Sequence, residues 1–292
     1  MMNLSCWMYA TAISLAVSTC LRAEPAFKAV IIDGQNNHAW QSTTPLLRKT
    51  LEDTKLFTVD VVTTPSSGQD LSPFKPDFGV YDVVVSNYNG EPWPEATQAA
   101  LVDYIRSGGG LTIVHAANNA FPQWPAYNEM IGLGWRDANF GDRITIDDAG
   151  NAVRTPKGEG PGAGHGPQHE FTITIRDPEH QVTKGMPREW LHASDELYHG
   201  QRGPANNMRI LATAFSDAAK GGTGAHEPMI WEIPFGEGRV FTTVMGHSPE
   251  AMQCVGFIVT LQRGAEWAAT GKVTQTELPA DFPTADKSSL RK

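Results

Sequence analysis

Residues Gly108 to Trp135 read GGGLTIVHAANNAFPQWPAYNEMIGLGW, and the other predicted elements are arranged around this stretch. The glycines follow an amphipathic segment, Glu95 to Arg106, and lead into an apolar run, Leu111 to Val114, that ends at His115. A helix, a glycine turn, a buried strand and a polar residue at its carboxyl end are typical of an open α/β sheet, where ligands bind beyond the strands. The alternative interpretation is an ordinary buried strand followed by a loop of core aromatics.

Apolar runs upstream extend the pattern. Strands are predicted at Phe27 to Ile32, Phe57 to Thr63 and Tyr81 to Ser86, with a helix from Pro45 to Leu56 that Thr44 would cap. Helices that alternate with buried strands predict an α/β fold, doubly wound around a mainly parallel central sheet. A final helix is predicted from Pro249 to about Thr270. Further strands are predicted at Ile144 to Asp147, Phe171 to Ile175, Arg209 to Phe215, Met229 to Ile233 and Arg239 to Met245.

The chain divides into three parts. Residues 1–23 resemble a signal peptide, because Trp7 to Leu21 is apolar or small and Ala23 precedes a plausible cleavage site at Glu24. Residues 24–275 are expected to form one α/β domain, followed by a C-terminal tail at 276–292. We therefore expect a periplasmic or secreted protein without stable membrane insertion after cleavage. Lipoprotein anchoring at Cys20 stays open, as does the oligomeric state.

Charge and cysteine content restrict the partners. A net charge of -9 and a pI near 5.4 argue against nucleic acid or an anionic membrane surface. After cleavage Cys254 would be the one remaining cysteine, so no intramolecular disulfide can form. It is interpreted as a small core residue rather than a nucleophile.

Titratable side chains gather where predicted strands stop. His38, His115 and His247 each follow such a strand, and doubly wound topology brings strand ends to one edge. The segment from Asp195 to His199 adds two adjacent carboxylates, which raise one another's pKa and suit acid/base work. A solvated acidic loop is the alternative. The candidate catalytic residues are His115, Asp195, Glu196 and His247.

The number of histidines also suggests a divalent metal such as zinc, manganese or nickel. The candidate ligands are His38, His115, His169 and His199. This stays a hypothesis, because no HExxH or CxxC motif supports it. Neither a P-loop nor a GxGxxG loop is present, so no nucleotide cofactor is expected, and no GxSxG elbow occurs.

Aromatic, amide and guanidinium side chains suggest a cleft for a small carbohydrate, in which flat rings stack on sugars and polar groups bind hydroxyls. The alternative is that half of these aromatics are core residues. The candidate substrate-binding residues are Asn37, Trp93, Asn118, Asn119, Trp124, Trp135, Arg136 and Tyr198.

Four blocks resemble the ThuA-like (trehalose utilisation) family. They are the stretch from Gly108 to Trp135, IIDGQNNHAW at residues 31–40, DELYHGQRGPANNMRILATA at residues 195–214 and HEPMIWEIPFGEGRVFTTVMGH at residues 226–247. The resemblance covers about Phe27 to Thr270 and implies a flavodoxin-like sandwich of the class I glutamine amidotransferase-like fold. It also implies a role in carbohydrate metabolism. The elbow that would carry a nucleophilic cysteine carries His115 here, so glutamine amidotransferase activity is excluded.

The sequence thus predicts an exported carbohydrate-active enzyme that acts on a glucoside or keto-sugar derivative. The sequence does not distinguish between hydrolysis, elimination and isomerisation. Each of these reactions would use acid/base chemistry, with or without a metal. The alternative is a non-catalytic sugar-binding protein that uses the same cleft.

Overall fold

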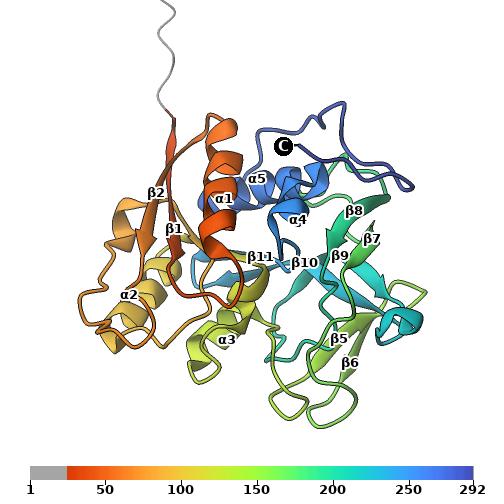
Figure 1. Cartoon of the computed structure of the whole chain (residues 1–292), viewed down its shortest axis with the longest axis horizontal. Helices are drawn as coiled ribbons and strands as arrows, with labels where there is room; N and C mark the ends of the chain where they lie inside the picture. Colours follow the sequence, from red (N-terminus) through yellow and green to blue (C-terminus); the bar gives the residue numbers. More distant parts are fainter. Residues whose placement is uncertain (1–24, 292) are drawn as a thin grey trace, which may run out of the picture.

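Five parallel strands form one half of the sheet in the computed structural model, which describes residues 25–291. Figure 1 shows them with the helices that cover them. Their order is β2-β1-β3-β4-β11, the flavodoxin-like order in which the chain first runs outward and then reverses. The inner strands are apolar on both sides because helices cover both faces. The bounds are β1 (Phe27–Asp33), β2 (Phe57–Thr63), β3 (Val83–Ser86), β4 (Gly110–Val114) and β11 (Gly238–Thr243).

The other half of the sheet is antiparallel. The α/β fold is confirmed, but the prediction of a mainly parallel sheet is wrong, because the described sheet is mixed. A two-residue turn, Gly236-Glu237, joins β10 to β11, and a connection that short allows only antiparallel pairing. The bounds are β7 (His169–Ile175), β8 (Glu189–Asp195), β9 (Arg209–Ser216) and β10 (Ala225–Phe235), with a hairpin of β5 (Arg143–Ile146) and β6 (Ala152–Thr155) attached to β10.

Helices cover both faces of the parallel half (Figure 1). One face carries α1 (Trp40–Asp53), α4 (Pro249–Gln253) and α5 (Val255–Thr270), and the other carries α2 (Glu95–Arg106) and α3 (Pro125–Ile131). The predicted bounds of α2 are confirmed. Three short 3₁₀ helices complete the elements: η1 (Phe78–Val80), η2 (His115–Asn119) and η3 (Ala218–Lys220).

The predicted start of α1 is wrong. The helix begins at Trp40, and Pro45 lies inside it. The hydroxyls of Thr43 and Thr44 instead accept hydrogen bonds from Nδ2 of Asn87, at 3.1 and 3.0 Å. These bonds attach α1 to the end of β3, and residues 34–39 connect β1 to the helix.

Two buried arginines fix the irregular segments. Arg202 donates to the backbone carbonyls of Gly141, Pro156, Glu159 and Pro161, and so ties the insertion between α3 and β7 to the sheet. Arg263 donates to the carbonyls of Val182, Lys184, Gln275 and Thr276. A buried guanidinium needs such acceptors, so both loops are held in one conformation.

Residues 276–291 pack along the domain. The Leu191 amide donates to the Thr284 carbonyl, and the Val255 amide donates to that of Ser289. The predicted signal peptide and Cys20 lie outside the described residues. No helix within residues 25–291 is long and apolar enough to cross a membrane.

Candidate metal centre

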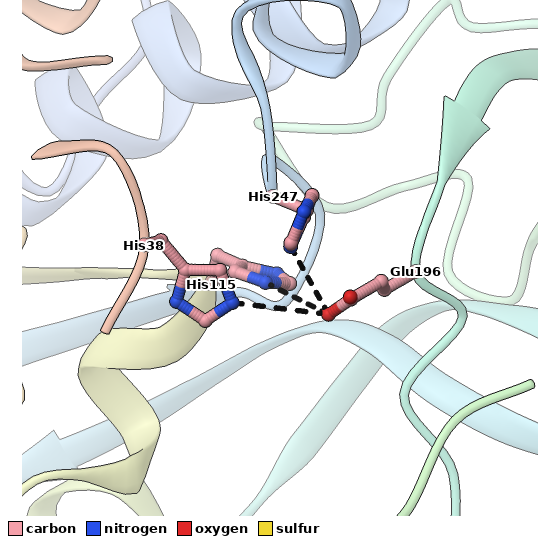
Figure 2. Close-up of side chains that lie close together, drawn as sticks. All are labelled: His38, His115, Glu196 and His247. Atoms are coloured by element: carbon pink, nitrogen blue, oxygen red, sulfur yellow. Dashed lines mark ion pairs between the residues drawn. The ribbon is translucent and has the colours of Figure 1, made fainter. Parts of the chain in front are cut away.

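Four side chains converge at one edge of the sheet: His38, His115, Glu196 and His247 (Figure 2). One potential ligand atom from each lies within 4.8 Å of the others. Oε2 of Glu196 is 3.9 Å from Nε2 of His38, 3.6 Å from Nε2 of His115 and 3.1 Å from Nδ1 of His247. We call these four residues the His₃Glu cluster.

The topology explains why residues so distant in sequence meet. His38, His115 and His247 follow β1, β4 and β11, parallel strands whose carboxyl ends share an edge. Glu196 arrives from the antiparallel half, directly after β8. His115 adopts a left-handed backbone conformation, φ 44°, which costs a non-glycine residue about 1 kcal/mol. Strain of this kind is found where a side chain must be aimed at a site.

Hydrogen bonds orient the imidazole rings. Nδ1 of His115 lies 2.8 Å from the carbonyl oxygen of Val244, and Nδ1 of His38 lies 3.1 Å from Oδ1 of Asn36. Since these oxygens only accept, each Nδ1 must carry the proton and each Nε2 must present a lone pair to the cluster. Nδ1 of His247 faces the carboxylate directly, at 3.1 Å from Oε2 of Glu196. Metal-binding histidines usually donate their second ring N–H to an oxygen in the way that His115 and His38 do here.

The protonation states favour a cation. Burial alone would raise the pKa of Glu196, but the imidazoles of His115, His247 and His38 that face its carboxylate outweigh burial and lower that pKa strongly, so the carboxylate stays ionised. Burial, with the neighbouring imidazoles, lowers the pKa of His38. The bond to Glu196 raises the pKa of His247. Three imidazoles and one carboxylate fit the ligand preferences of zinc, manganese or nickel, so the cluster could hold a divalent metal ion.

Tyr198 competes for one of these lone pairs. Its hydroxyl lies 2.9 Å from Nε2 of His115 and donates to it. Burial raises the pKa of Tyr198, so the hydroxyl keeps its proton. A metal ion at Nε2 would displace this bond and leave the hydroxyl free to donate elsewhere.

We therefore expect Tyr198→Phe to bind zinc about five-fold more tightly than the wild type. The substitution removes the competing donor, and one hydrogen bond contributes about 1 kcal/mol. Competition titration with a fluorescent chelator measures this change. Weaker zinc binding by the variant would show instead that the hydroxyl supports the site.

His165 forms the exposed side of the centre. Its Nε2 lies 3.5 Å from Oε1 of Glu196, and its side chain is 35% exposed. The ring is flanked by Trp135 and Tyr198, with centroids at 5.6 and 6.2 Å. The backbone of Gly164, the residue before it, exchanges two hydrogen bonds with His199, which anchors this end of the insertion. His165 was not among the predicted site residues, although it ends the proline- and glycine-rich stretch of the insertion.

Asp195, a predicted catalytic residue, is completely buried. Its carboxylate accepts hydrogen bonds from the amides of Glu196, Gly246 and His247, at 2.8, 2.7 and 3.0 Å. It also pairs with His192, at 2.9 Å from Nε2. Burial lowers the pKa of His192, but the bond to Asp195 outweighs it and raises that pKa to about 9. Asp195 therefore positions two members of the cluster and does not face a substrate.

Two histidines predicted as metal ligands lie outside the cluster. Nδ1 of His169 is bonded to the carbonyl of Pro167, at 2.8 Å. Nδ1 of His199 lies 3.2 Å from Oγ of Ser216. His169 is the first residue of β7 and His199 follows β8, and neither is among the four residues whose potential ligand atoms converge.

The predicted sugar-binding residues separate into two groups. Trp135 and Tyr198 border the cluster, Asn119 lies beside Tyr198, and Asn37 lies in a neighbouring groove. The other group is buried and structural. In that group Trp93 and Trp124 pack with Phe121, Asn118 donates to Gln201, and Arg136 donates to the carbonyls of Asn119, Ala120 and Trp135.

The fold and the cluster together define a flavodoxin-like α/β protein with a candidate metal centre at the carboxyl edge of its sheet. The family model ThuA, described as trehalose utilisation, matches residues 28–268. The chain therefore belongs to the ThuA family, which confirms the resemblance seen in the sequence.

Solved structures agree with this assignment. A ThuA-like protein from Parabacteroides merdae is 46% identical, with a TM-score of 0.87, over 91% of this chain and 98% of that one. A ThuA-like protein from Bacteroides uniformis is 20% identical, with a TM-score of 0.60, over 89% of this chain and 97% of that one, and shares the fold. A comparison with curated proteins finds no match.

Proposed function

We propose that the protein is an exported carbohydrate-active enzyme that acts on a glucoside or keto-sugar derivative with the help of a divalent metal. The observation that carries this proposal is the convergence of three oriented imidazoles and an ionised carboxylate beside the exposed ring of His165. A carbohydrate substrate is supported by the family description, trehalose utilisation.

The His₃Glu cluster would bind the metal. When bound, a divalent cation supplies Lewis-acid polarisation of a carbonyl or hydroxyl oxygen of the sugar. Trp135 is half-buried beside His165 and offers an aromatic face to the sugar ring. The hydroxyl of Tyr198 can donate a hydrogen bond to a sugar oxygen.

His165 is the group best placed to move a proton. Its Nδ1 donates to the carbonyl of Gly166, at 2.7 Å, which leaves Nε2 without a proton and able to accept one. In a keto-glycoside the proton on the carbon next to the carbonyl is acidic. His165 would take that proton, the C–O bond to the leaving group would break with its electron pair, and a C=C bond would form. The same proton would then return to the leaving oxygen.

A turnover assay with 3-keto-glucosides tests this function. We expect the wild type, supplied with zinc, manganese or nickel, to consume the substrate. His165→Gln should lower kcat by at least about 100-fold, the usual contribution of general acid–base catalysis, while keeping its metal. His226→Gln, which changes a histidine outside the centre, is the matched control. Sugar binding without turnover by the wild type would favour the alternative, a non-catalytic sugar-binding protein.

Export rests on the composition of residues 1–23. Sequencing the amino terminus of protein recovered from the periplasm or medium tests it. A start at Glu24 is expected, whereas an acylated start at Cys20 would indicate a lipoprotein. Retention of the full chain in the cytoplasm would contradict export.

A further inference from the structure

A groove of about 540 Å³ lies beside the metal centre, at the carboxyl ends of β1 and β3. The chain leaves these neighbouring strands in opposite directions, toward β2 and toward β4, so the groove lies at the topological switch point of the sheet. Its lining residues are Gly34, Gln35, Asn36, Asn37, Trp40, Ser66, Ser67, Asn89, Gly90 and Glu91.

Hydrogen bonds hold the walls of the groove in place. The buried side chain of Gln35 donates to the carbonyl of Pro65, at 2.7 Å, and accepts from the amide of Glu91, at 2.9 Å. Glu91 in turn accepts from Ser67 and from the amide of Gly68, at 2.8 and 3.0 Å. The loops after β1, β2 and β3 are thus tied to one another, and a ligand would meet a preformed surface.

The charge of the lining excludes an anionic ligand. None of the lining residues is Lys or Arg, and the one ionisable side chain is the carboxylate of Glu91. Flavodoxin-like proteins can bind a phosphorylated cofactor at this switch point, but a phosphate here would meet a like charge and no cation. The groove therefore suits an uncharged ligand.

The remaining groups suit a sugar ring. Trp40 is partly exposed, lines the groove and is not among the hydrophobic side chains that pack against the core of the described residues. Asn89 donates to Oδ1 of Asn37, while Nδ2 of Asn37 has no protein acceptor within residues 25–291. An aromatic side chain beside the free amide group of Asn37 complements the apolar face and the hydroxyls of a pyranose.

Asn36 links the groove to the metal centre. Asn36 lines the groove, and its Oδ1 accepts hydrogen bonds from Nδ1 and the amide of His38, a member of the cluster. A sugar ring in the groove would therefore lie next to a sugar ring bound at the metal centre. We infer that the groove binds a second, uncharged sugar ring of the substrate, with Trp40 as its stacking platform. This inference rests on the proposed function and makes the substrate a disaccharide or a glycoside with a sugar-like aglycone.

NMR of the tryptophan side chains tests the inference. The indole N–H signals of Trp40 and Trp135 are assigned with Trp40→Phe and Trp135→Phe, and the protein is titrated with glucose, maltose, cellobiose and trehalose. We expect at least one disaccharide to shift both signals. Trp40→Ala should weaken its binding about ten-fold, as the loss of one stacked ring implies, and leave the glucose-induced shift of Trp135 unchanged. Phe215→Ala, which removes an exposed aromatic ring on β9, should change neither.

Two results would overturn the inference, and they can be told apart. A disaccharide that shifts Trp135 but not Trp40, with affinity unchanged in Trp40→Ala, would remove the second subsite and leave the proposed function standing. If no sugar shifted either signal, the carbohydrate function and the subsite would both be wrong.

Discussion

Replacing Glu196 with alanine is expected to lower zinc affinity by more than about 100-fold and to abolish sugar turnover. Glu196 supplies the only carboxylate of the His₃Glu cluster, and its Oε2 lies within 3.9 Å of a nitrogen on each of the three histidines. Loss of an outer partner of a metal ligand already costs up to about 100-fold in affinity, and loss of a ligand should cost more. Chelator competition measures the change.

The matched control is Glu170→Ala. Glu170 is exposed, lies outside the cluster and bonds only to Ser288 among the described side chains. This variant should bind zinc as the wild type does. Equal zinc affinity in Glu196→Ala and the wild type would mean that the carboxylate is not a ligand.

The second large effect is expected from Asp195→Asn. The buried carboxylate accepts from the amides of Glu196 and His247, so it fixes the backbone of two members of the cluster. An asparagine presents one oxygen and one NH₂, and its NH₂ would face a backbone N–H. Breaking the buried pair with His192 should cost about 3 kcal/mol of unfolding free energy. Zinc affinity should fall about ten-fold or more even at temperatures where the variant is folded.

Urea unfolding and chelator competition on the same preparations separate the two consequences. Asp177→Asn is the control, because Asp177 pairs with the exposed Arg209 and should contribute less than about 1 kcal/mol. If Asp195→Asn lost stability but kept wild-type zinc affinity once folded, Asp195 would stabilise the fold without positioning the metal ligands.

The sequence allowed the parallel half of the fold to be predicted because it obeys local rules. Apolar runs gave β1 and β4, the segment rich in β-branched residues at Phe57–Thr63 gave β2, and the periodic segment Glu95–Arg106 gave α2 with its correct bounds. The same rules place a residue after each strand at one edge. Three members of the cluster, His38, His115 and His247, could therefore be grouped without coordinates.

The antiparallel half was harder to predict. No strand was expected before Asp195, since the segment of β8 mixes Trp, His and acidic residues and pairs with β7. The approach of Glu196 to the histidines depends on how the two halves of the sheet close on each other, which no local pattern encodes. The position of His165 also depends on contacts between distant residues, since the buried guanidinium of Arg202 determines where the insertion lies. His165 could therefore not be predicted as a site residue from a local pattern.

The metal content of the purified protein shows whether the His₃Glu cluster binds a metal ion. Wild type and His115→Ala are dialysed against zinc, manganese or nickel, freed of unbound metal and compared by elemental analysis. We expect near-stoichiometric metal in the wild type and its loss in His115→Ala, because the bond to Val244 directs the His115 imidazole into the cluster. No metal in the wild type, or equal metal in both proteins, would contradict this expectation.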